Sequence, residues 1–307
     1  MATLLRLGTR GSKLALTQAG LVRDALAAAV PALVAPDAIE IVAIRTTGDV
    51  IQDRPLSEAG GKGLFVKEIE DALLTRRIDA AVHSMKDMPV LQPMGLEIVA
   101  FLPREDARDV LIAGETKRIA DLKRGAVVGT SALRRKAQLL HLRPDLKIVN
   151  LRGNVDTRLA KREAGVVEAT LLALAGLKRL GTAHVGTPVP EEEILPAVGQ
   201  GAVCIECRAD DARTRAWLAA IDHKPTAVCV AAEHAMLAVL DGSCRTPIAG
   251  HAVLSGDSLR LRGLIVKPDG SELLATERQG AAGDAQAMGR DAGSELKRRG
   301  GPGFLST

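Results

Sequence analysis

Residues 80–90, AAVHSMKDMPV, place three titratable side chains directly after an apolar run. His83, Lys86 and Asp87 follow the run, and Pro89 comes two residues after the acid. We expect a buried strand to deliver these groups to one loop at the edge of a sheet. A carboxylate held there can move protons and stabilise a developing cation. An ordinary turn, with an acid shortly before a proline, is the alternative that these residues alone leave open.

A cluster of cations occupies residues 130–158, TSALRRKAQLLHLRPDLKIVNLRGNVDTR. Arg134 and Arg135 fall in the first turns of a predicted helix that Thr130 or Ser131 would cap. Cations at that end oppose the helix dipole. Their position therefore favours a bound anion, held by free backbone N–H groups and guanidinium groups together. A solvated basic face is the simpler alternative.

Two further helix starts carry a nearby arginine. Arg152 precedes a helix that Asn154 would cap, and Arg10 precedes Ser12, the expected N-cap of the first helix. Arginine binds carboxylates and phosphates through pairs of parallel hydrogen bonds. Together, the three helix starts predict a cleft for a polyanion.

The length and composition are typical of a globular protein with several domains. A chain of 307 residues predicts two or three domains. Aromatic residues make up only 1%, fewer than we expect in a protein that stacks on nucleic-acid bases. Four cysteines are too few for a disulfide scaffold and indicate a reducing compartment. We expect a cytoplasmic chain without a signal peptide or a membrane span.

The order of the predicted elements indicates an α/β fold. A strand in LLRLGTRGS is followed by a helix from Ser12 to about Ala28, a strand at 38–46, a helix at 64–77 and a strand at 79–84. This order predicts a parallel sheet with helices on both faces.

A second α/β unit begins near residue 103. Its predicted strands span 109–114, 126–130 and 147–151, its helices 131–142 and 154–165, and residues 169–180 complete it. Another apolar strand is expected at 195–208. The rest of the chain predicts a helix at 226–240, hairpin strands with Gly-Asp and Asp-Gly turns, a helix near 283–298 and a disordered tail.

Two short motifs predict no chemistry of their own. GGKG at 60–63 lacks the upstream glycine and the following Ser or Thr of a phosphate-binding loop. Cys204 and Cys207 have C-x-x-C spacing, but on a strand their thiols face opposite sides, and no second Cys or His pair accompanies them. We therefore expect core cysteines and no metal site.

Seven motifs carry a resemblance to a known family. They are GTRGSKLALTQ, GGKGLFVKEIE, AVHSMKDMP, GTSALRRKAQL, LRGNVDTRL, GQGA and DGSCRTPIAG. With these motifs in this order, from about residue 5 to beyond 250, the sequence resembles the porphobilinogen deaminases, also called hydroxymethylbilane synthases.

The resemblance implies an α/β fold with two lobes like those of periplasmic binding proteins, each with a mixed, mainly parallel sheet, and a small α+β C-terminal domain. Domain 1 would comprise residues 1–102 and 198–220, domain 2 residues 103–197, and domain 3 residues 221–307. The active-site cleft would lie between the two lobes. As in the family, we expect a monomer that binds neither nucleic acid nor membrane.

The resemblance also implies a transferase reaction. Family members join four porphobilinogen units head to tail and release ammonia at each step. The product is the linear tetrapyrrole hydroxymethylbilane, a precursor of haem-type pigments. The implied partners are porphobilinogen and the growing oligopyrrole chain. A dipyrromethane cofactor, thioether-linked to a cysteine, primes that chain, and by resemblance the cysteine is Cys244.

By the same resemblance, Asp87 is the catalytic carboxylate. It would assist the departure of ammonia, stabilise the azafulvene-like cation and help remove the proton from the new pyrrole junction. Each pyrrole carries an acetate and a propionate, which cationic side chains would neutralise. The residues implied in binding cofactor and substrate are Arg10, Ser12, Lys62, Lys86, Ser131, Arg134, Arg135, Arg152, Arg158 and Arg179.

Three positions depart from the pattern of the family. Gly11, Glu58 and Ala132 stand where many members have a larger polar residue, a lysine and a second serine, respectively. These changes would affect the hydrogen bonds of the cofactor and the behaviour of a lid loop. They leave Asp87, the arginines and Cys244 in place.

Two other classes of protein remain as alternatives. A non-catalytic binding protein or regulator with the same two lobes is the stronger one, because a fold alone does not establish catalysis. Nucleic-acid binding through residues 130–158 is the weaker one, because the aromatic content is low and no known reader motif is present.

Overall fold

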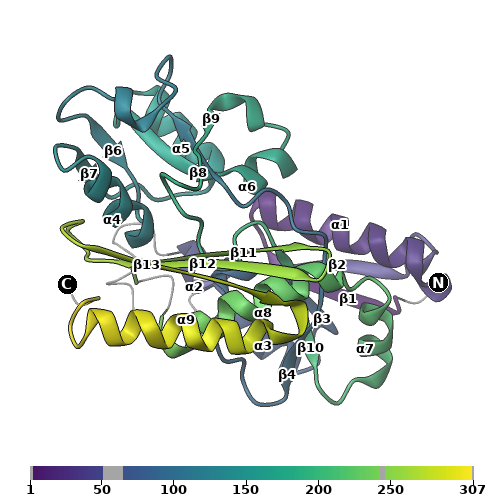
Figure 1. The fold of residues 1–307 in the computed structure, drawn as a ribbon. Coiled ribbons are helices and arrows are strands. Elements are labelled where there is room, and N and C mark those ends of the chain that lie inside the picture. Colours follow the sequence, from purple (N-terminus) through teal and green to yellow (C-terminus); the bar gives the residue numbers. More distant parts are fainter. Residues whose placement is uncertain (1–2, 51–64, 243–245, 306–307) are drawn as a thin grey trace. The chain divides into compact units, whose positions relative to one another are not determined.

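The computed structural model describes residues 3–50, 65–242 and 246–305 (Figure 1). These residues form two compact units. The first unit contains residues 3–50, 65–105 and 202–227, and the second contains residues 106–201, 228–242 and 246–305.

The first unit is built on a five-stranded sheet with the order β2-β1-β3-β10-β4. β1 is parallel to β2 and β3, and β10 is antiparallel to β3 and β4. The predicted β-α-β-α-β order is thus confirmed, and β10 joins the sheet from a distant part of the chain. The strands are β1 (Leu5–Arg10), β2 (Ile39–Ile44), β3 (Ala80–Ser84), β4 (Leu96–Phe101) and β10 (Val203–Arg208).

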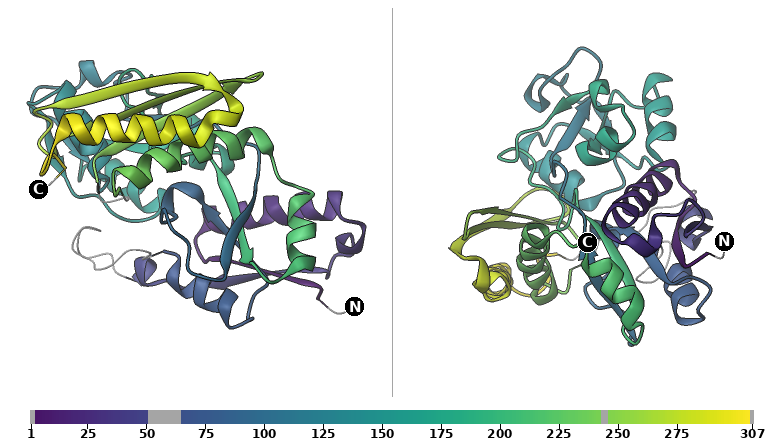
Figure 2. Two further views of the ribbon diagram at one scale, coloured as in Figure 1. Left: turned by 60° about the horizontal axis from the view of Figure 1, so that its bottom comes forward. Right: turned by 90° about the vertical axis from the view of Figure 1, so that its right-hand side faces the viewer.

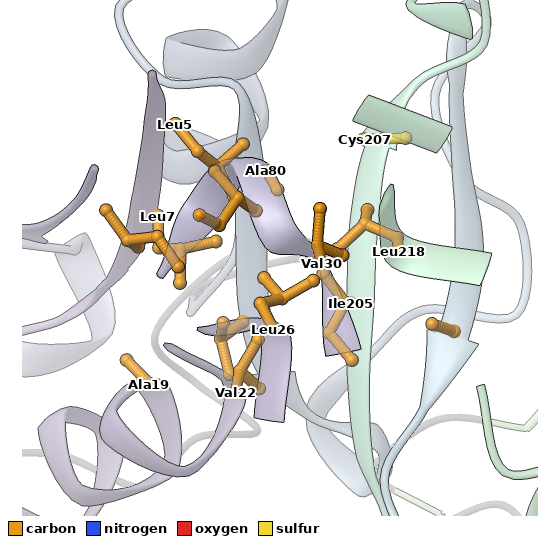
Figure 3. Packing of buried hydrophobic residues seen from close by; sticks show 14 of the residues in the cluster. Leu5, Leu7, Ala19, Val22, Leu26, Val30, Ala80, Ile205, Cys207 and Leu218 are labelled. Atoms are coloured by element: carbon orange, nitrogen blue, oxygen red, sulfur yellow. The ribbon is translucent and has the colours of Figure 1, made fainter. Parts of the chain in front are cut away.

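Helices cover both faces of this sheet because its buried strands are apolar on both sides. On β3, Val82 packs in the cluster formed with α1 (Lys13–Ala29), whereas the next residue toward the N-terminus, Ala81, packs with α3 (Lys67–Leu74). Figure 3 shows Val22 and Leu26 of α1 in the first of these clusters. The remaining helical segments are η1 (Pro31–Leu33), α2 (Thr47–Val50), η2 (Met85–Asp87) and α7 (Ala212–Ala219).

The second unit contains another mixed five-stranded sheet, ordered β7-β6-β8-β5-β9. β6 is parallel to β7 and β8, and β5 is antiparallel to β8 and β9. Its strands are β5 (Asp109–Ile112), β6 (Val127–Gly129), β7 (Lys147–Val149), β8 (Ala169–Ala173) and β9 (Thr187–Pro188). Its helical segments are η3 (Ile119–Asp121), α4 (Leu133–Leu142), α5 (Val155–Glu163), α6 (Leu174–Arg179) and η4 (Ala183–Val185).

A three-stranded antiparallel sheet completes the second unit. Its strands are β11 (Ile248–Ser255), β12 (Ser258–Val266) and β13 (Leu273–Ala281), accompanied by α8 (Lys224–Val239), η5 (Ala282–Asp284) and α9 (Ala285–Gly300). Figure 2 shows α9, in yellow, running along this sheet. α8 and α9 approach closely at Gly293, where an added Cβ would lie 2.8 Å from the carbonyl oxygen of Met236. A side chain there would separate the two helices.

Several sequence predictions require correction. β10 begins at Val203 rather than at 195, because Gly199 and Gly201 take positive φ angles of 71° and 89° and turn the chain. α3 ends at Leu74, before Arg76 with its φ of 58°, rather than at 77. The tail was expected to be disordered, yet Phe304 is buried and its ring faces Lys267.

The three sheets fall one in each of the three domains predicted from the sequence. The limits proposed for those domains remain a prediction. In the described part of the chain, no helix is long and apolar enough to cross a membrane.

Candidate active site

A pocket lies in the first unit, next to the carboxyl ends of β1 and β3. Ligands of α/β proteins bind at this edge of the sheet, where loops carry polar groups between the strands and the helices. The wall combines apolar surface with one carboxylate, two cations and several hydroxyl groups. The lining residues are Thr9, Arg10, Ser12, Leu14, Ala15, Gln18, Phe65, Val66, Val82, His83, Ser84, Lys86 and Asp87.

Asp87 is half-buried in this wall, at the end of the short η2 helix. The backbone N–H of Met85 donates to the carbonyl of Ala202 at 3.0 Å, and the N–H of Met88 donates to Met85 at 3.1 Å. Both methionine side chains are buried. The apolar residues on either side therefore anchor the loop, and Lys86 and Asp87 line the pocket, as the sequence predicted for this motif.

Arg10 and Ser12 line the same pocket at the start of α1. Ser12 is the N-cap, as predicted, and its hydroxyl accepts a hydrogen bond from the N–H of Ala15 at 3.3 Å. The Arg10 guanidinium lies 4.3 Å from the ring centre of Phe65, a cation–π contact. An arginine and a helix N-terminus at one place attract an anion.

Arg134 and Arg135 lie in the second unit, at the start of α4, with exposures of 6% and 5%. Both donate to Asp109 at the start of β5, at 2.8 Å and 2.7 Å. They also donate to the carbonyls of Leu195 and Leu171. The helix dipole argument required an anion here, and the structure supplies a carboxylate of the chain itself.

Asp109 is fully buried between these arginines and also accepts from Gln200 at 2.8 Å. Burial alone would raise the pKa of this carboxyl group, but the charges and hydrogen bonds of Arg134 and Arg135 hold it well below its ordinary value. Two guanidinium groups and one carboxylate leave one net positive charge in this hydrogen-bonded cluster. A ligand carboxylate nearby would offset that charge.

Ser131 shortly precedes α4, and Arg152 shortly precedes α5. Both residues lie at the same edge of the second sheet. The Ser131 hydroxyl donates to the carbonyl of Leu151 at 3.2 Å, and Arg152 is buried immediately beyond. Asn154 caps α5, as predicted, by accepting from the N–H of Thr157 at 2.8 Å. Parallel strands β6 and β7 explain this meeting, because their carboxyl ends lie at one edge.

The other two predicted arginines also hold backbone carbonyls in the second unit. Arg158 donates to Gly153 at 2.8 Å, and Arg179 donates to Gly201 at 2.7 Å. Both side chains thus fix turns that contain glycine. Their predicted contacts with ligand carboxylates remain a prediction.

Lys62, Cys244 and Glu58 lie outside the described residues. Of the other departures from the family pattern, Gly11 has open space where a Cβ would stand. Ala132, not Thr130 or Ser131, is the N-cap of α4, and it has no side-chain oxygen to cap the helix.

Cys204 and Cys207 are buried on β10 and form no disulfide. Burial raises the pKa of both thiols, that of Cys207 to about 12, so both stay protonated and unreactive. Within the described ranges, no group of three or more His, Cys, Asp or Glu residues is arranged to hold a metal ion.

Sequence reasoning missed two residues of these sites. Asp109 is the single acid in the apolar strand DVLI, and that isolation was the available signal. An isolated acid in a buried strand requires a partner. Phe65, the partner of Arg10, had no comparable signal, because a single aromatic residue is usually part of a core.

The fold and these sites define a class: an α/β protein with two mixed sheets and a small antiparallel sheet, suited to a ligand rich in carboxylates. A family model described as porphobilinogen deaminase, dipyromethane cofactor binding domain, matches residues 5–216. Another, described as porphobilinogen deaminase, C-terminal domain, matches residues 227–298. The chain belongs to the porphobilinogen deaminase family, as its motifs predicted.

Curated relatives cover nearly the whole chain. The porphobilinogen deaminase of Paracoccus denitrificans is 59% identical over 296 residues, which cover 96% of this chain and 94% of that protein. The chloroplastic porphobilinogen deaminase of Oryza sativa subsp. japonica is 52% identical, over 99% of this chain and 86% of that protein.

Among solved structures, the chain was compared with an ABC-transporter periplasmic substrate-binding protein from Coxiella burnetii. Its TM-score is 0.44 at 16% identity, over 75% of this chain and 96% of that chain. The predicted fold class agrees with the sheets of the described residues, which are two mixed, mainly parallel sheets and a small antiparallel sheet with helices.

The described residues fit the dipyrromethane cofactor that the family implies. The pocket in the first unit offers apolar surface from Leu14 and Val82 for a pyrrole ring and the Asp87 carboxylate for its N–H groups. Arg10 and Lys86 offer positive charge for acetate and propionate groups. The buried cluster around Asp109, with its net positive charge, suits the same carboxylates in the second unit.

Proposed function

We propose that this chain is a transferase that condenses four porphobilinogen molecules head to tail, releases ammonia at each step and yields hydroxymethylbilane. The observation that carries the proposal is the family match over residues 5–216, which includes Asp87 in a pocket with two cations. The cofactor, when bound to Cys244, supplies a primer with a free pyrrole α-carbon. Side chains of this protein carry out the other steps.

Asp87 acts on the reacting substrate. Its carboxylate accepts hydrogen bonds from pyrrole N–H groups and so stabilises the positive charge that develops at the methylene carbon as ammonia leaves. It then helps remove the proton from the new junction. Because Asp87 is half-buried, its charge acts in an environment of lower dielectric constant than water.

Cationic side chains hold the acetate and propionate groups during these steps. Arg10, Ser12, Lys62 and Lys86 serve the first unit, and guanidinium groups bind carboxylates with defined geometry. In the second unit this task falls to Ser131, Arg134, Arg135, Arg152, Arg158 and Arg179. For Arg134 and Arg135, Asp109 fixes the position of the guanidinium groups, so that they are preorganised for a ligand.

We further propose that the protein works as a cytoplasmic monomer and binds neither nucleic acid nor membrane. Membership of the family supports this proposal. A non-catalytic binding protein with the same lobes is the alternative, and it predicts binding of porphobilinogen without release of ammonia.

Turnover of porphobilinogen tests the function directly. We expect purified protein to release one ammonia per porphobilinogen consumed and to form a tetrapyrrole that closes in acid to a porphyrinogen. Ammonia is measured enzymatically, and the porphyrinogen is oxidised with iodine to a porphyrin, which is measured by its absorbance. Binding of porphobilinogen without ammonia release would support the alternative.

A further inference from the structure

A buried cluster of three titratable side chains lies next to the Asp87 pocket in the first unit. His83 on β3, Glu206 on β10 and Glu70 on α3 have exposures of 5%, 0% and 8%. His83 Nε2 lies 3.2 Å from Oε2 of Glu206. His83 also lines the pocket. Groups of this kind are rarely buried without a role.

The strand register explains why these groups meet. On the antiparallel pair β3 and β10, Cys204 stands opposite His83 and Glu206 opposite Ala81. Paired residues share a face, so His83 and Glu206 both point to the side that α3 covers. Glu70 of α3 completes the cluster from that side.

The hydrogen bonds of the cluster are incomplete. Oε1 of Glu70 and Oε1 of Glu206 are buried and have no hydrogen-bond partner among the described residues. Two ionised carboxyl groups at this place would repel each other, so ionisation of Glu70 is disfavoured while Glu206 is charged. Burial raises the pKa of Glu70, and the charge of Glu206 raises it further, to about 7, although His83 opposes this shift.

Other charged groups near the cluster are either engaged elsewhere or part of the pocket. Arg208 on β10 donates to backbone carbonyls and to Asp79 and Asp211. Asp71 on α3 is exposed and raises the pKa of Glu70 slightly. Two cations line the pocket. Lys86 lies in the η2 loop, and Arg10 is the last residue of β1.

Cys204 connects the cluster electrostatically with Asp87. Burial raises the pKa of its thiol most, and the charges of Glu206 and Asp87 raise it further. Both carboxylates therefore lie within Coulomb range of one buried atom. The charges at Asp87 and at Glu206 thus both act on the Cys204 thiol, which stands opposite His83 on the neighbouring strand.

We propose that His83, supported by Glu206 and Glu70, accepts the proton that leaves the pyrrole α-carbon in the Asp87 pocket. This inference rests on the proposed function. The C–N bond of the protonated aminomethyl group breaks, and ammonia leaves with the electron pair. The α-carbon forms the new C–C bond, and its C–H electron pair returns to the ring. The proton passes to the imidazole and from there to solvent, where ammonia takes it up.

The proposal predicts a characteristic dependence on pH. The cluster can accept a proton only while it lacks one, so kcat falls as the pH decreases through about 7, where Glu70 titrates. Glu70→Gln removes the carboxyl group whose pKa burial and the charge of Glu206 raise to about 7. This variant should move the acid limb of the kcat profile down by about half a pH unit or more.

Glu206→Gln removes the carboxylate whose Oε2 lies 3.2 Å from Nε2 of His83. We expect kcat to fall about tenfold or more with little change in KM, because substrate binding does not involve this residue. His83→Asn should have a similar effect, and the double variant should be no worse than either single variant. Glu40→Gln, at an exposed carboxyl group on β2, is the matched control and should leave the profile unchanged.

Infrared spectroscopy provides a readout that does not depend on activity. The carbonyl stretch of a protonated carboxyl group should titrate near pH 7 in the wild-type holoenzyme and in Glu40→Gln, and it should be absent in Glu70→Gln. Thermal unfolding identifies variants that fail to fold. If Glu206→Gln is among them, the infrared band and the kcat profile of Glu70→Gln decide the question.

The outcomes separate this inference from the proposed function. Wild-type turnover with no band near pH 7, or with the same kcat profile in Glu70→Gln, would overturn the proton-acceptor role and leave the function intact. A wild-type protein that releases no ammonia would contradict the function itself.

Discussion

Asp87→Asn should lower kcat by about two to four orders of magnitude while the protein keeps its fold and its bound cofactor. The amide has nearly the shape of the carboxylate, so the η2 loop and its buried methionines should remain in place. It carries no negative charge, however, and cannot stabilise the cation that forms as ammonia leaves. Single-turnover measurements of ammonia release check this result.

A matched control for this variant is Asp24→Asn, which removes an exposed carboxylate from α1 in the same unit. It should leave kcat unchanged. Intact mass of the Asp87→Asn protein establishes that the cofactor is present before turnover is measured. Near-normal turnover by that holoprotein would refute the role assigned to Asp87.

Asp109→Asn should be the most destabilising single exchange of a polar residue in the second unit. The variant leaves the guanidinium groups of Arg134 and Arg135 buried without their carboxylate. Loss of one partner from a buried ion pair costs about 3 to 5 kcal/mol. Urea unfolding should show this loss in the free energy of unfolding.

The destabilisation should depend on pH in a defined direction. Because the pKa of Asp109 is lowered in the folded protein, its contribution is fully present above about pH 4, the ordinary range of an aspartate. Below that pH the contribution declines, and the difference between wild type and variant should shrink. Asp121→Asn, which breaks an exposed pair with Arg118, is the control and should not change stability measurably. Equal effects of the two variants would contradict the role given to Asp109.

Local sequence patterns predicted those structural features that a single residue and its sequence neighbours determine, such as helix caps and strand ends. Ser12 and Asn154 were identified as helix caps because a side-chain oxygen just before a helical repeat can accept a hydrogen bond from a free N–H group of the first turn. The loop with Asp87 was predicted because an apolar strand ends directly before it. These features depend on neighbours in the sequence.

Other features depend on contacts between distant residues and could not be predicted in this way. The anion beside Arg134 is Asp109, 25 residues away, and no local pattern joins them. His83 and Glu206 are separated by 123 residues and meet only because β10 returns beside β3. Phe304 is buried although its surroundings in the sequence, GGPGFLST, are typical of a disordered tail.

The central claim, that this chain builds a tetrapyrrole on a cofactor it carries itself, is tested most directly by intact mass spectrometry with a peptide map across Cys244. We predict an added mass of two linked pyrrole units on that cysteine, followed by species heavier by one further unit at a time when porphobilinogen is added. A Cys244 that stays unmodified, even after incubation with porphobilinogen, would contradict the account.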